Sequence, residues 1–95
     1  MPFARKVVLH SLSGYQPSLD ELVRQFMRDG VSYVGVVGMD ALHIEDIVDE
    51  LCVGDGTQPY EMLTASHEGQ SLESAVQFAA ALTGKFAGET QVVEF

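Results

Sequence analysis

Two patterns of apolar residues alternate along the chain. Short runs that are typical of β-strands occur at residues 6–12, 31–37, 60–65 and 90–95. Apolar residues three and four positions apart, the spacing of one face of an α-helix, occur at residues 18–30, 40–54 and 71–84. The pattern therefore predicts four strands that alternate with three helices.

The first predicted helix has signals at both ends. Ser18 and Glu21 form a capping-box pattern, in which the serine hydroxyl accepts from the Glu21 amide and the Glu21 side chain reaches back. Gly30 stands where a left-handed C-cap is expected. The face expected to be buried consists of Leu19, Leu22, Val23, Phe26 and Met27.

The other two helices are delimited in the same way. Asp40 is the expected N-cap of the second helix, which ends before Gly54, and Ser71 is the expected N-cap of the third, which Gly84 closes. The apolar residues expected to face the sheet are Ile44, Ile47, Val48 and Leu51 in the second helix, and Leu72, Ala75, Val76, Ala79 and Leu82 in the third.

Strands separated by helices of this length are typical of βαβ crossovers, which join parallel strands. We therefore predict an α/β fold, a three-layer sandwich around a four-stranded, mainly parallel sheet. Our preferred strand order is 2-1-3-4, a subset of the flavodoxin-like arrangement, and an antiparallel last strand stays open. The nearly continuous run at residues 31–37 predicts a well-covered strand, and the polar residues within 90–95 predict an edge strand.

Chain length predicts one domain. At 95 residues, 1–95 fit one α/β unit and leave no second core. A domain of this size buries a modest share of its surface and has a narrow stability margin, which a homodimer would widen.

Charge is the least ordinary property of the composition. The formal net charge is -9, and residues 31–95 hold one basic residue, Lys85, against eleven acidic residues. Such a surface repels phosphate backbones, which argues against DNA or RNA binding. It would attract a basic protein partner, although acidity that serves only solubility remains an alternative.

The sequence also predicts a compartment. Cys52 is the only cysteine, and the first six residues lack the apolar core of a signal peptide. No apolar run approaches the length of about 20 residues that spans a bilayer. We therefore expect a cytoplasmic protein with no membrane partner.

In an open parallel sheet, ligands bind beyond the carboxyl ends of the strands, where the strand order reverses. With the order 2-1-3-4, this point lies between the first and third strands, with Asp40 one strand away. The candidate ligand-binding residues are His10, Ser11, Ser13, Asp40, Ser66, His67 and Glu68.

These residue types suit a divalent metal or general acid–base chemistry. However, no His-x-x-x-His spacing places two ligands on one helix. Structural roles also account for the candidates: His10 as a strand-end residue, Asp40 as a helix cap, and His67 as a polar loop residue. We therefore expect no metal and no cofactor, and we assign no catalytic residue.

Motifs for other chemistries are absent from the sequence. It has no Gly-x-Ser-x-Gly elbow, no dinucleotide fingerprint and no P-loop. The loop after the first strand has one glycine, Gly14, and no Lys or Arg. Cys52 has no Cys-x-x-Cys partner and is expected to be a buried core residue without reactivity.

The second predicted helix has an acidic face. Glu45, Asp46, Asp49 and Glu50 recur at helical spacing, opposite the apolar positions, and are our candidate partner-binding residues. A solvated helix face explains them, but a basic partner would also reverse the repulsion between them. Small acidic α/β proteins that plug the basic cleft of a nuclease or toxin are similar to this chain in size and charge, a similarity of class that no motif supports.

Two functional hypotheses follow, with a homodimer as a third. The first is a non-enzymatic protein-interaction or regulatory module that binds a basic protein. The alternative is a small-ligand- or metal-dependent enzyme with its site at the carboxyl ends of the strands. A dimer would use the strand at residues 90–95 or a helix face.

Overall fold

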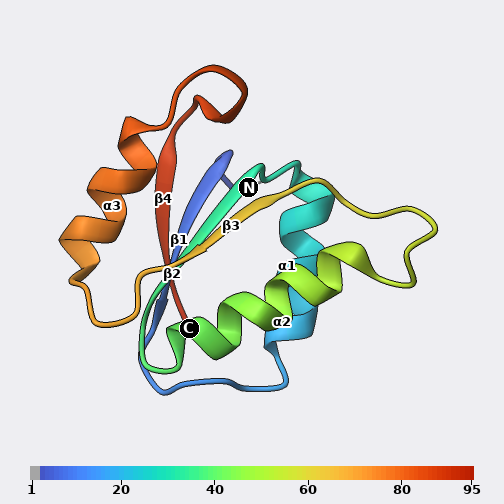
Figure 1. Cartoon of the computed structure of the whole chain (residues 1–95), viewed down its shortest axis with the longest axis horizontal. Coiled ribbons are helices and arrows are strands. Elements are labelled where there is room, and N and C mark those ends of the chain that lie inside the picture. Colours follow the sequence, from blue (N-terminus) through green and yellow to red (C-terminus); the bar gives the residue numbers. More distant parts are fainter. Residues whose placement is uncertain (1–2) are drawn as a thin grey trace.

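The computed structural model describes residues 3–95, apart from the side chain of Lys85. It confirms the α/β alternation (Figure 1). The elements, in chain order, are β1 (Lys6–Ser11), α1 (Leu19–Asp29), β2 (Tyr33–Gly38), α2 (Ala41–Val53), β3 (Leu63–Ser66), α3 (Leu72–Ala81), a 3-10 turn η1 (Gly84–Phe86) and β4 (Thr90–Glu94).

All four strands are parallel, in the order β3-β2-β1-β4. The predicted order 2-1-3-4 is therefore wrong, although the parallel α/β class and the edge position of β4 are confirmed. The sequence could not settle the order because β1 and β2 are both almost continuously apolar and both are buried. They take the two central places, and the shorter, more polar β3 and β4 take the edges.

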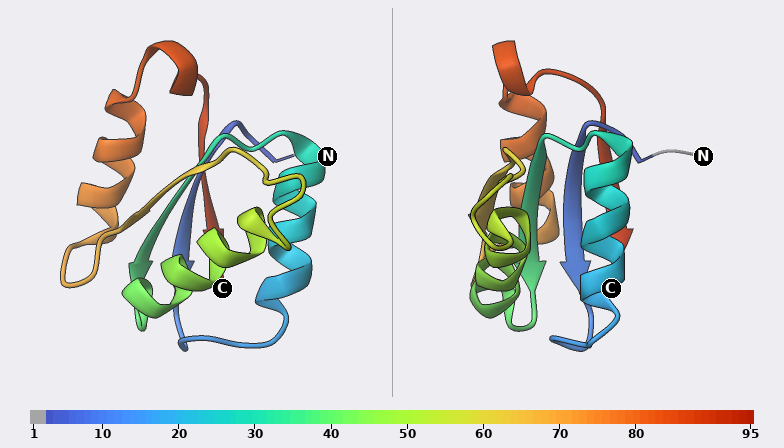
Figure 2. Two further views of the ribbon diagram at one scale, coloured as in Figure 1. Left: turned by 45° about the vertical axis from the view of Figure 1, so that its right-hand side comes forward. Right: turned by 90° about the vertical axis from the view of Figure 1, so that its right-hand side faces the viewer.

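This order also decides which face each helix covers. The crossovers from β1 to β2 and from β2 to β3 step in one direction, and the crossover to β4 returns in the other. Right-handed connections therefore place α1 and α2 on one face and α3 on the other, which gives three layers (Figure 2). No helix among residues 3–95 has both the length and the apolar character needed to cross a membrane.

The face under α1 and α2 is an apolar core. Val7 and Leu9 of β1 and Val34 and Val36 of β2 point to this side. They pack with the buried helix residues Leu19, Val23, Phe26, Ala41, Ile44, Val48 and Cys52. The helical spacing in the sequence predicts most of this set correctly.

The face under α3 is different. Its buried apolar residues are Val8, Tyr33, Val37, Ala75 and Ala79, so the helix contributes only alanines to the fully buried layer. Leu72, Val76 and Leu82 pack against this layer but are only partly buried, so α3 buries fewer large side chains than the other two helices.

Lys6 provides a polar contact to α3. Its side chain is buried, and Nζ donates to the carbonyl oxygens of Ala79 at 2.7 Å and Leu82 at 3.3 Å. These carbonyls belong to the last turn of α3 and to its C-cap residue, Leu82, where a helix lacks internal donors and favours a cation. The ammonium group of β1 thus caps α3, a role that the position of Lys6 at the start of a strand does not suggest.

The predicted helix ends are confirmed in part. Gly30 is left-handed, and the hydroxyl of Ser71 accepts from the amide of Ser74 at 3.1 Å. Ser18 makes no capping hydrogen bond, because its backbone is already helical rather than extended, so the predicted capping box is wrong. Helix α3 ends at Ala81, and Gly84 begins η1 instead.

Candidate functional site

The loops that follow β1, β2 and β3 meet at the carboxyl edge of the sheet. The amide of Met39 donates to the carbonyl of Ser11 at 3.1 Å, and the amide of Leu42 donates to Oε2 of Glu68 at 3.1 Å. These bonds join the first loop to the second and the second to the third. The structure thus brings candidate residues from all three loops to one edge, with the β2 loop in the middle.

The position of β2 corrects the expected site. The strand order reverses between β1 and β4, not between β1 and β3. His10 and His67 both lie on the α3 face, but Val37 of β2 lies between them. Two strand spacings separate their backbones by about 10 Å. Among residues 3–95, no three His, Cys, Asp or Glu side chains are grouped so that they could hold a metal ion.

Ser11 and Ser13 organise the loop after β1. The buried Oγ of Ser11 accepts from the amide of Gly14 at 3.2 Å, and Oγ of Ser13 accepts from Nε2 of Gln16 at 2.7 Å. Gly14 has a φ of 87°, and a Cβ there would come within 2.7 Å of Oδ2 of Asp40. The loop therefore lies directly against the carboxylate of Asp40.

Asp40 has a strained backbone. Its φ of 57° is the only left-handed value among the non-glycine residues of 3–95. Asp40 is the N-cap residue of α2, as predicted, but its side chain makes no capping bond, and its carboxylate lies beside Gly14 instead. Glu68 accepts from the Leu42 amide and caps α2 from another loop. Strain of this kind persists where the surrounding structure holds it, and it often marks functional segments.

Ser66 and Glu68 also interact with each other. Oγ of Ser66 is placed to accept from the amide of Glu68 at 3.4 Å, a long hydrogen bond. Glu68 is exposed, and its carboxylate faces the N-terminus of α2, where the helix dipole favours a negative charge. Ser66 thus stabilises the β3–α3 loop, and Glu68 connects that loop to the start of α2.

His67 is buried under α3. Its Nε2 lies 3.2 Å from the hydroxyl of Tyr33, its Nδ1 lies 3.2 Å from Oε1 of Gln70, and its ring packs against Phe78 at 5.2 Å. With a proton on Nδ1, the ring donates to Oε1 of Gln70, which can only accept. Burial raises the pKa of Tyr33 from 10.0 to about 12. The two ring nitrogens are therefore occupied inside the protein.

Gly35 makes room for this arrangement. A Cβ at this position would collide with the Tyr33 hydroxyl, so the tyrosine ring lies across the glycine. His10, in contrast, is half-buried on β1, in register with Val37 on one side and Glu94 on the other. The two predicted histidines thus have different surroundings.

Exposed apolar side chains form the feature that the sequence did not predict. Leu12, Tyr15, Met39 and Leu42 are between 39% and 57% exposed. They come from the loop after β1, the loop after β2 and the first turn of α2. The Tyr15 ring lies 5.8 Å from the ring of His43 in an edge-on contact. The sequence offered little signal for them: Leu12 was assigned to the predicted strand at residues 6–12, and β1 ends one residue earlier, at Ser11. No pocket opens among the described residues, so these side chains lie on an open surface.

The acidic face of α2 adjoins these side chains. Asp46, Asp49 and Glu50 are exposed, as predicted, but Glu45 is half-buried and accepts from Oγ1 of Thr64 at 2.7 Å. The expectation that four carboxylates share one solvent face is therefore wrong for Glu45, which faces β3. Two exposed apolar residues, Leu42 and Val53, lie near the two ends of the acidic face of α2.

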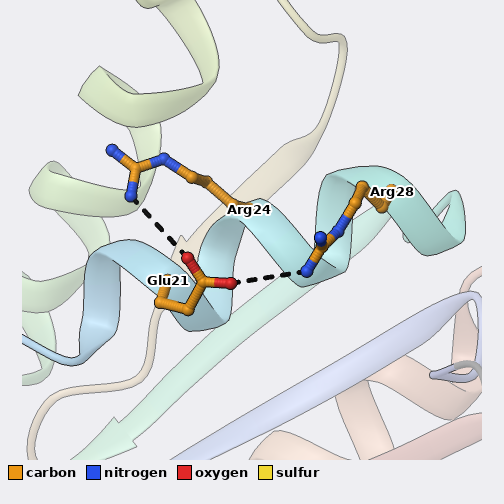
Figure 3. A network of polar contacts seen from close by, with 3 residues as sticks. All are labelled: Glu21, Arg24 and Arg28. Atoms are coloured by element: carbon orange, nitrogen blue, oxygen red, sulfur yellow. Dashed lines mark hydrogen bonds and ion pairs between the residues drawn. The ribbon is translucent and has the colours of Figure 1, made fainter.

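The described basic side chains do not neutralise this face. Arg24 and Arg28 both pair with Glu21 on α1, at 3.9 and 3.4 Å (Figure 3). Lys6 is buried against α3. Within the part of the chain that the structure describes, no ion pair involves an acidic residue of α2. The negative charge of α2 is thus left to solvent or to a partner.

Cys52 lies on the buried side of α2, as expected. Its Sγ is 3.8 Å from Sδ of Met62. Burial and, to a smaller extent, the carboxylate of Asp49 raise the pKa of the thiol to about 11. A thiol with this pKa stays protonated near neutral pH and is a poor nucleophile.

Comparison with known proteins identifies a family. Residues 1–93 match the family described as "Domain of unknown function (DUF7684)", and the chain belongs to this family. No curated protein and no solved structure matches the chain.

Proposed function

We propose that this member of the DUF7684 family is a non-enzymatic protein-binding module that recognises a basic protein. The observation that carries the proposal is the exposed apolar group at the carboxyl edge of the sheet, next to an acidic helix face. We call this region the α2 edge surface; it consists of Leu12, Tyr15, Met39, Leu42, Asp46, Asp49, Glu50 and Val53.

The apolar part supports protein binding. Contiguous exposed apolar side chains rimmed by polar residues are typical of protein-binding sites, whereas small-molecule sites are usually concave. Met39 and Leu42 are both more than half exposed, and Tyr15 adds a ring with a polar tip. Tyrosine and methionine are enriched in protein interfaces, where each large side chain that becomes buried contributes about 1.5–3 kcal/mol.

The acidic part supports a basic partner. Asp46 is three residues before Asp49 and four before Glu50, so these like charges repel along one helix face. Each such pair destabilises a helix by about 0.2–0.5 kcal/mol, and a facing Lys or Arg would reverse the sign. The net charge of -9 would also accelerate the approach of a positively charged protein.

Affinity capture with the whole chain as bait tests this proposal. Captured proteins are identified, purified and titrated against the bait at rising salt. We expect saturable binding that weakens steadily with salt, because screening acts on exposed charges. The bait variant Asp46→Asn/Asp49→Asn should weaken binding by about tenfold, and Leu42→Ser should do the same without a change in charge.

A matched variant separates the effect of the charges on α2 from the effect of the net charge of the chain. Glu73→Gln/Glu89→Gln removes the same two charges from exposed positions outside the α2 edge surface. It should leave the affinity within about twofold of that of the unmodified chain. Equal losses in both double variants, or no saturable basic partner at low salt, would rule out the α2 edge surface as the binding site.

A further inference from the structure

The outer edge of β4 is open, and the hydrogen bonds to β1 show which of its backbone groups point outward. Phe95 donates to the carbonyl of His10 at 2.8 Å and accepts from the amide of Leu12 at 2.8 Å. Alternate residues of a strand bond to opposite sides, so Gln91 and Val93 also face β1. The amides and carbonyls of Thr90, Val92 and Glu94 therefore face away from the sheet.

The outward amides and carbonyls of β4 can pair with the same groups of β4 in a second copy of the chain. Val92 is the middle residue of β4 (Thr90–Glu94). If a second copy runs antiparallel about a two-fold axis at Val92, each Val92 faces the other Val92, and each Thr90 faces Glu94 of the other copy. Every facing pair then exchanges two N–H···O bonds, because all three residues point their backbone groups outward. No outward donor or acceptor of the strand is left without a partner.

The side chains are compatible with the same pairing. Val92 is 42% exposed on the α3 face, and the pairing would bring the two valines together. The charged Glu94 would lie opposite the neutral Thr90, so no like charges face each other across the strands.

The other open edge, β3, is less suitable for self-pairing. It has four residues instead of five, and it adjoins α2, where Glu45 bonds to Thr64. Pairing there would bring the acidic helices of two copies toward each other. Charge therefore favours β4 over β3 as the contact between copies.

We propose that β4 pairs with β4 of a second copy, antiparallel and in register about Val92, to form a continuous eight-stranded sheet across two copies of the four-stranded one. The dimer combines two chains of net charge -9, so added salt should strengthen it by screening their repulsion. Binding of a basic partner to the α2 edge surface should respond to salt in the opposite direction.

Sedimentation equilibrium of the whole chain, from micromolar to millimolar concentration at low and high salt, tests the stoichiometry. Hydrogen exchange followed residue by residue by NMR tests the site. We expect the amides of Thr90, Val92 and Glu94 to become protected as concentration rises. Those of Gln91 and Val93, which face β1, should be protected at every concentration. A monomer throughout, or a dimer in which the three outward amides still exchange freely, would overturn the proposal.

Two variants sharpen the test. Val92→Pro removes an outward amide that β1 does not use, so it should abolish dimerisation while circular dichroism shows a folded chain. Val92→Thr keeps the amide and the shape and should still dimerise. A Val92→Pro protein that dimerises as before would place the contact elsewhere. Should that variant not fold, the hydrogen exchange of the unmodified chain still decides the question. The variant Asp46→Asn/Asp49→Asn separates this proposal from the proposed function, because it should weaken binding of the basic partner and leave dimerisation intact.

Discussion

The two faces of the sheet are held to their helices by different chemistry. On the face of α1 and α2, branched and aromatic side chains from strands and helices pack into one apolar cluster. On the face of α3, a buried ammonium group and a hydrogen-bonded Tyr–His pair accompany the apolar contacts. On the face of α3, therefore, polar contacts stand beside the two buried alanines of the helix and its partly buried Leu72, Val76 and Leu82.

The two faces also differ in what a substitution removes. Truncating a side chain in the apolar cluster leaves a cavity, and its cost follows the volume lost. Truncating a polar group under α3 leaves a partner without its hydrogen bond, and the cost follows the burial of that partner. The following substitutions test this contrast, from the largest expected effect to the smallest.

Leu9→Ala should have the largest effect. Leu9 is fully buried in the cluster under α1 and α2, so its loss should lower the free energy of unfolding by about 2–5 kcal/mol. Urea denaturation followed by circular dichroism measures the change. Leu12→Ala is the control, because Leu12 is exposed and should change stability by less than about 0.5 kcal/mol. Similar losses in the two variants would contradict this assignment of the core.

Lys6→Met tests the cap on α3. The substitution keeps most of the side-chain volume but removes the ammonium donor from the carbonyl of Leu82 and from that of Ala79, which still accepts from the Leu82 amide. The free energy of unfolding should fall by about 1–3 kcal/mol. Arg5→Met removes the same charge from an exposed neighbour and should have little effect. A Lys6→Met protein as stable as the original would mean that apolar contacts alone hold α3.

Tyr33→Phe removes the hydroxyl that contacts His67. The buried imidazole loses a partner, and the free energy of unfolding should fall by about 1 kcal/mol. Urea denaturation at neutral pH measures this loss. Tyr15→Phe, at an exposed ring, should be close to neutral.

The same tyrosine predicts a pH dependence. Its pKa is raised by burial from 10.0 to about 12, so the folded chain keeps a proton that the unfolded chain loses. The stability due to this group is complete below pH 10 and is lost as the pH rises toward 12. Denaturation curves across this window should show a steeper fall for the unmodified chain than for Tyr33→Phe. Parallel falls in both proteins would contradict the assignment to Tyr33.

Glu68→Ala should have the smallest effect. It removes the carboxylate that accepts from the Leu42 amide at the start of α2, at an exposed position where water can replace it. We expect a loss of about 0.5 kcal/mol in thermal or urea unfolding. Asp40→Asn is the control and should be nearly neutral, since Asp40 makes no capping bond. A Glu68→Ala loss no larger than that of Asp40→Asn would contradict the assignment of the capping bond to Glu68.

The candidate site was only partly predictable, because the surroundings of its residues depend on tertiary contacts. Sequence reasoning placed Asp40, His67 and Glu68 at the carboxyl ends of the strands, and the structure has them there. It could not show that Glu68 caps a helix from another loop or that the ring of His67 is buried, because both depend on residues distant in sequence. Leu12 and Met39 went unnoticed because exposure of an apolar residue follows from the packing around it.

The sequence alone determined the elements of the fold. Periodicity of apolar residues specifies strands and helices locally, and the length of the connections requires parallel neighbours, so the α/β class was predictable. Only the tertiary structure decided the order β3-β2-β1-β4, because two strands of equal apolar character can occupy either central place. That order, in turn, placed His10 and His67 on either side of β2, brought Lys6 under α3, and left β4 open at the edge.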